Sequence, residues 1–276
     1  MRPDVGYGRR MTDANADSKL HRALTMGIDL VGSGVGGALG VVLGGDAVSS
    51  AISSMTGTSI AAVGRDVASR LLSPRQEARI GVVFLHAGAS IKAKEVMGRK
   101  IREDDFWKGD HSHGSEFAEG VMLTAMDTFE ERKIPYLANV LANVATDDGV
   151  DPATANLAIR LSRNLSWMEM CIIAIVMRAD DFPLPQRTRY VPTGWDEWTV
   201  SNAVNQISGD SGLLQYKQPK PTDEEFISGL DLRLSALGLS NSGQLVGGLM
   251  QLNEIPADDI RPVHERLLAG TPESQA

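Results

Sequence analysis

Cysteine and aromatic residues are scarce in this chain. Its 276 residues include one cysteine, and Phe, Trp and Tyr together make up 5%. A single cysteine excludes an internal disulfide framework, and the apolar run around Cys171 is typical of a buried thiol in a reducing compartment. With so few aromatic residues, the core must consist mainly of Leu, Ile, Val, Ala and Met. That composition favours interlocking helices over a β-sandwich.

Positive charge is also in short supply. The chain has 27 Lys and Arg against 35 Asp and Glu, which gives a net charge of −8. Nucleic-acid binding draws most of its affinity from Lys and Arg side chains that neutralise phosphates. The charge balance therefore argues against a nucleic-acid partner.

The two uncharged stretches near the N-terminus are poor candidates for a permanent membrane span. Residues 30–45 would form a helix of only about 24 Å, which is less than the roughly 30 Å of a hydrocarbon core. Residues 47–64 are interrupted by seven Ser or Thr side chains. We expect a cytoplasmic protein whose contact with the inner membrane is conditional.

Glycine, by contrast, is concentrated near the N-terminus, where residues 27–64 hold ten of the chain's 28 glycines. Four of them, here called the glycine ladder, recur at every fourth position and form a smooth stripe on a helix: Gly32, Gly36, Gly40 and Gly44. Residues 32–45 hold seven glycines in all, which cost a helix roughly 6 kcal/mol relative to alanine. Close approach of a partner helix is the usual compensation, which predicts a homo-oligomer, a protein partner or a membrane contact.

The glycine ladder resembles the glycine-zipper segments of membrane-perturbing and pore-forming proteins. The resemblance covers only the glycine-rich segment and implies oligomerisation or membrane insertion. A tight helix–helix contact within an ordinary soluble bundle is the alternative. The same segment, at 32–37, also satisfies the dinucleotide fingerprint G-x-G-x-x-G. No βαβ unit or acidic residue follows at the required distance, so a nucleotide site is disfavoured.

Signals for the start of a helix recur along the rest of the chain. Ser73-Pro74 and Asp151-Pro152 each combine an N-cap with a proline at the first helical position, and Gln76 completes a capping box at the first of them. Short strands are expected near 213–218. Helices are expected over 74–101, 196–208, 223–237, 242–252 and 257–268. Four more are expected between the first two of these ranges. One is capped by Ser115 and has Phe129 on its inner face, one starts at Pro135, one follows Asp151 and one is capped by Ser166.

These elements predict an all-α protein without the β-α alternation of a parallel sheet. Residues 1–16 are expected to be a disordered leader and 17–72 a glycine-rich helical hairpin. A helical bundle over 73–179, a linker over 180–194 and a small helical domain over 195–270 follow. This last domain loosely resembles the end of a winged-helix domain, where helices flank a short hairpin.

One cluster of side chains has the composition of a metal site. His111 and His113 lie within Asp110-His111-Ser112-His113, and Glu116 follows close by, so two imidazoles and nearby carboxylates are available for zinc. The alternative is a solvated polar loop between two helices, where such residues collect without a ligand. His111, His113 and Glu116 are therefore the candidate metal ligands.

Other chemistry finds little support in the sequence. Cys171 has no neighbouring histidine, and His86 sits within the helix predicted over 74–101 as a packing residue. The chain has no nucleophile elbow and no Walker loop. We predict no catalytic residue and no cofactor, which favours a non-enzymatic role.

Three segments resemble parts of a group of bacterial helical proteins in which a glycine-rich N-terminal part precedes a helix pair. They are residues 131–143, 245–252 and 255–260. The resemblance implies a helical fold and a bacterial origin, without a mechanism.

Three hypotheses of function follow. The first is a non-enzymatic effector, acting in cell death or phage defence, whose glycine ladder oligomerises or enters a membrane. The second is a soluble adaptor or regulator that binds a protein partner through residues 195–268. The third is a metal-dependent enzyme.

Overall fold

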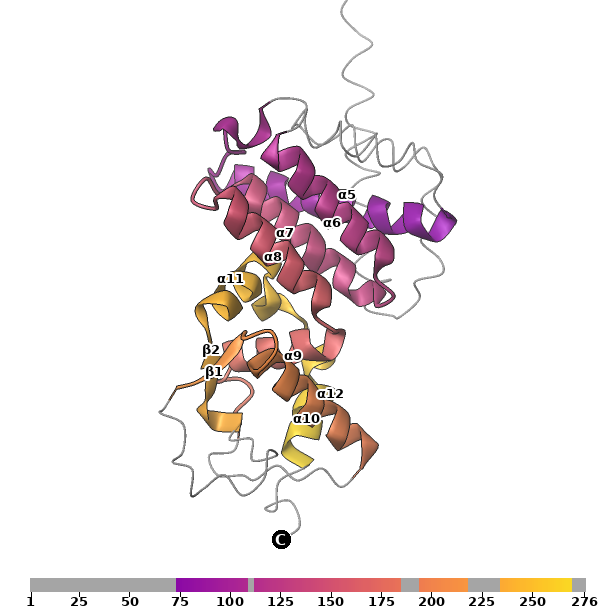
Figure 1. The fold of residues 1–276 in the computed structure, drawn as a ribbon, viewed down its shortest axis with the longest axis vertical. Helices are drawn as coiled ribbons and strands as arrows, with labels where there is room; N and C mark the ends of the chain where they lie inside the picture. The colour runs from indigo at the N-terminus through magenta and orange to yellow at the C-terminus, as the bar shows by residue number, and fades with distance from the viewer. Residues whose placement is uncertain (1–72, 109–111, 185–193, 218–233, 270–276) are drawn as a thin grey trace, which may run out of the picture. The chain divides into compact units, whose positions relative to one another are not determined.

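The computed structural model describes residues 73–108, 112–184, 194–217 and 234–269. The predicted leader over 1–16, the hairpin over 17–72 with its glycine ladder, and His111 lie outside these ranges. Within them the fold is mainly α-helical, with eight α-helices and one two-stranded sheet (Figure 1). The chain divides into two compact units, one ending at Ile159 and the other beginning at Arg160. The predicted fold class is confirmed.

The first unit is built on three helices that pack against one another: α5 (Pro74–Val96), α6 (His113–Asp127) and α7 (Ile134–Ala145) (Figure 1). Short 3₁₀ turns, η1 (Asp105–Trp107) and η2 (Glu131–Lys133), connect them. The helices share a core of fully buried side chains, among them Ile80, Phe84, Phe117, Met122, Leu137 and Leu141. The core is mostly aliphatic, as the composition predicts.

Two of the predicted helix starts are confirmed in this part of the chain. The Ser73 side chain accepts a hydrogen bond from the backbone N–H of Gln76, and the Gln76 side chain accepts one from the backbone N–H of Ser73. Asp151 caps α8 (Pro152–Asn164) by accepting bonds from the N–H groups of Ala153 and Thr154 at 2.8 and 3.1 Å. The Thr154 hydroxyl also donates to Asp151, and these bonds hold the pKa of that carboxyl below its ordinary value.

The prediction that Ser115 caps α6 is wrong. Ser112 holds the N-cap position with an extended backbone, and its Oγ accepts the N–H of Ser115 at 3.1 Å. The helix therefore begins three residues earlier than predicted. It also ends at Asp127, so Phe129 lies beyond the helix and is 86% exposed instead of facing inward.

The helix predicted over 74–101 ends earlier, at Val96. Gly98 has a φ of +84°, a left-handed conformation that stops the helix. The backbone N–H groups of Gly98 and Arg99 bond to the carbonyls of Glu95 and Lys94, both at 2.9 Å. This pair of bonds is a Schellman motif, in which glycine is favoured because it carries no Cβ.

The second unit surrounds α9 (Trp167–Met177), whose residues Met170 to Ile175 are all buried. Ser166 caps α9 as predicted, in a capping box with Glu169. The helix packs against other elements of this unit: α10 (Trp195–Ser208), α11 (Asn241–Met250), η5 (Leu252–Glu254) and α12 (Ala257–Ala269). The structure thus groups α9 with the C-terminal elements, whereas the sequence places it in the preceding bundle.

The one sheet of the described residues is a short antiparallel pair in this second unit. Strand β1 (Leu214–Tyr216) pairs with β2 (Leu237–Leu239), with Leu214 opposite Leu239. In sequence α10 precedes β1 and α11 follows β2, so helices flank the strand pair as predicted. A helix is predicted over 223–237, and its last four residues are predicted wrongly. Leu234–Ala236 form a 3₁₀ turn (η4), and Leu237 is the first residue of β2. The part before residue 234 lies outside the described ranges.

Candidate functional site

The predicted metal ligands do not form a complete site among the residues that the structure describes. His113 and Glu116 both lie in the first turn of α6 and are exposed. His111 falls just before the described range 112–184. Within the described ranges, no three His, Cys, Asp or Glu side chains are grouped so that they could hold a metal ion. Zinc needs three or four protein ligands, so the two described candidates, His113 and Glu116, are not sufficient by themselves.

The other reactive side chains that the sequence singles out are packing residues. Cys171 is fully buried in α9, and its thiol points to the backbone carbonyl of Asp259 at 3.9 Å. His86 lies on α5, and its burial lowers the pKa of the imidazole. The burial of the Cys171 thiol and of the His86 imidazole fits the packing roles that the sequence predicts for them.

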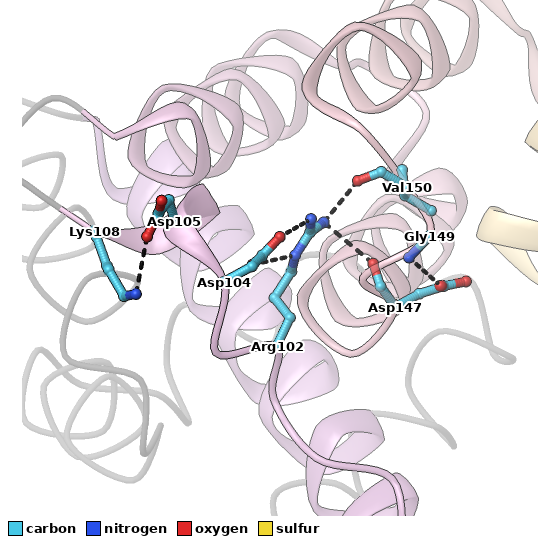
Figure 2. Close-up of polar contacts among 7 residues, drawn as sticks. All are labelled: Arg102, Asp104, Asp105, Lys108, Asp147, Gly149 and Val150. Atoms are coloured by element: carbon cyan, nitrogen blue, oxygen red, sulfur yellow. Dashed lines mark hydrogen bonds and ion pairs between the residues drawn. The ribbon is translucent and has the colours of Figure 1, made fainter.

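A buried arginine organises the main polar cluster of the first unit (Figure 2). Arg102 follows α5, and its Nη1 donates to the backbone carbonyls of Asp147 and Val150 at 3.1 and 2.7 Å. Its Nε donates to Asp104 at 2.8 Å, and its Nη2 completes a two-point contact with the same carboxylate. The hydrogen bonds from Arg102 hold the pKa of Asp104 below its ordinary value.

Arg102 joins two connections that are far apart in sequence. Its backbone N–H bonds to the carbonyl of Ala145 at the end of α7, and its side chain reaches the turn that leads to α8. In that turn the Asp147 side chain accepts the N–H of Gly149 at 3.0 Å, as Figure 2 shows. Nearly all the guanidinium donors are used within the protein. Arg102 is therefore an anchor for these loops and has little capacity left to bind a ligand.

Aromatic rings cover the same arginine. The guanidinium carbon of Arg102 lies 4.2 Å from the centre of the Phe106 ring, which meets the Trp107 ring edge to face at 5.2 Å. Phe106 also contacts Phe117 on α6 in the same manner at 6.3 Å. Three of the chain's 14 aromatic residues thus meet here, between η1 and the start of α6.

Gly114 is required by this aromatic cluster. A Cβ at this position would lie 2.2 Å from Cε3 of Trp107, so Gly114→Ala forces the indole out of its place. We expect the substitution to lower the free energy of unfolding by about 1–3 kcal/mol, the usual cost of overpacking a core. Urea unfolding followed by circular dichroism measures the change.

Gly120→Ala is the matched control in the same helix. A Cβ at Gly120 meets nothing within 4 Å, and alanine favours a helix by up to about 1 kcal/mol over glycine. Equal stability of the two variants would contradict the packing of Trp107 on Gly114.

The second unit carries an exposed aromatic pair at the start of α10. Trp195 is 82% exposed and Trp198 is 50% exposed, and their rings meet edge to face with centres 5.9 Å apart. Large exposed apolar side chains of this kind mark interaction surfaces, and tryptophan is enriched at binding hot spots. The sequence does not single out these residues, although two tryptophans three positions apart beside two acidic residues are a recognisable pattern.

Comparison of the chain with models of protein families, with curated proteins and with solved structures returned no match. The class of protein is therefore defined by the fold, which is a mainly α-helical chain of two compact units. The polar cluster around Arg102 is structural. Among the described residues, the exposed aromatic pair and the two candidate metal ligands on α6 are surface features with a candidate function.

Proposed function

We infer that this chain is a non-enzymatic bacterial effector whose glycine ladder drives oligomerisation or entry into a membrane, in cell death or phage defence. The observation that carries the proposal is the strict four-residue register of Gly32, Gly36, Gly40 and Gly44. That register leaves one face of a helix without side chains. Such a face is stabilised when another backbone approaches it closely.

A described helix supports this use of glycine. On α11, Gly243 and Gly247 are also four residues apart, and both lie against other segments of the chain. A Cβ at Gly243 would be 2.0 Å from the backbone oxygen of Leu213, and one at Gly247 would be 2.9 Å from Sδ of Met177. This chain therefore already uses the spacing of the ladder to bring segments close together.

The membrane part of the proposal depends on residues 30–64. In the stretches of chain that the structure describes, no helix combines the length and the apolar character needed to cross a bilayer. The non-enzymatic part is supported by the use of Cys171 for packing and of Arg102 for anchoring loops. His113 and Glu116 keep the metal-dependent alternative open.

The proposal is tested by expressing the full chain in bacteria, with cell fractionation and a dye for membrane potential. We expect the wild-type chain to enter the membrane fraction and to collapse the potential. The double substitution Gly36→Leu and Gly40→Leu should abolish both effects, because leucine side chains keep a second backbone away from the face. The matched control carries Gly34→Leu and Gly45→Leu, which add the same apolar bulk outside the register and should act like wild type.

The outcomes separate the two leading functions. An intact membrane potential, with unchanged fractionation and assembly in the double variant, rules out the effector. A cytosolic oligomer that never sediments with membranes favours the second candidate, a soluble adaptor acting through protein contacts. The observation in favour of that candidate is the exposure of Trp195 and Trp198 within the region 195–268.

A further inference from the structure

The exposed aromatic pair lies in an acidic setting. The aromatic patch is defined here as Trp195, Asp196 and Trp198, all of them exposed in the first turns of α10. Asp196 and Glu197 lie between the two tryptophans in sequence, and residues 194–216 contain no Lys or Arg. A partner of this patch therefore needs an apolar side chain to cover the indole rings and positive charge at its rim.

A second surface of the same chain has the complementary character. The α5 knob, residues 96–100, lies at the C-terminal end of α5 and is exposed throughout. Val96 is 85% exposed and Met97 is 74% exposed, although both are apolar. Arg99 and Lys100 follow immediately, so the knob combines an apolar tip with two positive charges.

The α5 knob has a defined backbone conformation. The Schellman bonds from Gly98 and Arg99 to the last turn of α5 hold it, with Gly98 in the left-handed conformation. A surface that is already ordered loses less conformational entropy when it binds. Methionine also adapts its shape to an aromatic surface and makes favourable contacts between sulfur and ring.

Two of the carboxylates that follow the knob are already neutralised. Asp104 is held by Arg102, and Asp105 is bonded to Lys108 at 2.9 Å, as Figure 2 shows. The positive charges of Arg99 and Lys100 are thus not offset by these two neighbours. With Glu95 and Glu103 also counted, residues 92–108 hold six Lys or Arg and four Asp or Glu, so a net positive charge remains to complement the acidic aromatic patch.

We propose that the aromatic patch on α10 is a docking site for the α5 knob of a second copy of this chain. Met97 and Val96 cover the indole rings of Trp195 and Trp198, while Arg99 and Lys100 face Asp196. The contact does not depend on the glycine ladder, so it adds a second mode of self-association to the proposed function.

The two parts of the contact have different physical roles. Burial of the tryptophan rings supplies most of the affinity, because tryptophans at the centre of an interface dominate binding energy. The charged rim mainly accelerates association and makes it dependent on salt. Association should therefore weaken at high ionic strength without disappearing.

The test measures self-association by sedimentation velocity over a range of concentrations. All chains carry Gly36→Leu and Gly40→Leu, which removes any contribution from the ladder. We expect the background chain to associate and Trp195→Ala to weaken association about 30-fold, the effect of a hot-spot residue worth about 2 kcal/mol. Phe129→Ala removes an aromatic side chain of similar exposure outside both surfaces and should leave association unchanged.

Charge reversal identifies the two surfaces as partners. Asp196→Lys in one chain, and Arg99→Glu with Lys100→Glu in another, should each weaken self-association about tenfold. An equimolar mixture of these two chains should restore it, because each reversed surface then meets an opposite charge on the other chain. If mixing restores association, the aromatic patch of one chain contacts the α5 knob of another chain and not its own.

Three results would overturn the proposal. The first is that the background chain stays monomeric at every concentration and at low salt. The second is that Phe129→Ala and Trp195→Ala weaken association equally. The third is that the mixture of charge-reversed chains associates no better than either chain alone. Because the ladder is substituted throughout, none of these results bears on the proposed effector function. Unchanged thermal melting of each variant shows that the fold is intact.

Discussion

Arg102→Met is expected to lower the free energy of unfolding by about 2–4 kcal/mol, because it removes a buried charged group that donates several hydrogen bonds. Methionine keeps much of the volume of the side chain but donates no hydrogen bond. The carbonyls of Asp147 and Val150 lose the bonds that Arg102 supplies, and the buried carbonyl of Val150, left unpaired, costs about 1–3 kcal/mol. Denaturant unfolding followed by circular dichroism measures the loss.

Two further variants distinguish the causes of this loss. Arg99→Met removes an exposed arginine three residues earlier and should change stability by no more than about 0.5 kcal/mol. Arg102→Lys keeps the charge but not the planar group that reaches Asp104 and two carbonyls at once, so an intermediate loss is expected. If Arg102→Met and Arg99→Met were equally stable, the anchoring role of Arg102 would be refuted.

Gly243→Ala is expected to have the second large effect, a loss of about 3 kcal/mol or more. The added Cβ would lie 2.0 Å from the backbone oxygen of Leu213 and 3.3 Å from a methyl group of Leu239. A backbone carbonyl cannot turn aside as a flexible side chain can, so α11 or the β1–β2 pair has to shift. The same carbonyl accepts the N–H of Ser240 at 3.0 Å, so the shift also disturbs the start of α11.

Gly248→Ala provides the control within the same helix. A Cβ at Gly248 meets nothing within 4 Å, and alanine should raise helix stability by up to about 1 kcal/mol. Gly247→Ala should fall between the two, because its nearest neighbour is the flexible side chain of Met177. Thermal unfolding of the three variants in parallel tests this order, and a Gly243→Ala chain as stable as Gly248→Ala would disprove the close approach.

Local signals predicted most of the helix starts correctly. Ser73, Asp151 and Ser166 all cap helices as expected, because the capping bond joins residues only two or three positions apart. The error at α6 has the same local origin. Ser112 and Ser115 are both suitable caps in sequence, and the structure uses Ser112.

The end of α5 and the start of β2 were harder to predict. The apolar residues at helical spacing led to a helix predicted as far as 101, whereas the left-handed conformation of Gly98 stops it at Val96. Leu237 lies where the pattern predicts a helix, but pairing with β1 draws it into a strand. A strand as short as this gains its stability from its partner, so the sequence of the segment does not reveal it.

The structural roles of Arg102 and Gly243 depend on distant parts of the chain. Arg102 is separated from Val150 by 48 positions, and no pattern in residues 99–108 distinguishes it from its exposed charged neighbours. Gly243 and Gly247, in contrast, repeat the four-residue spacing of the glycine ladder. The same rule applied to α11 would have identified them.

The amino-acid sequence was enough to predict that this protein is mainly α-helical, where most of its helices begin and that its core is aliphatic. These properties follow from composition, periodicity and hydrogen bonds between residues a few positions apart. The three-dimensional fold was needed to see that Arg102 is a buried anchor, that Gly243 is a point of contact between segments and that Trp195 and Trp198 face solvent. Each of these depends on which distant segments come together, and that choice is made by packing of the whole unit.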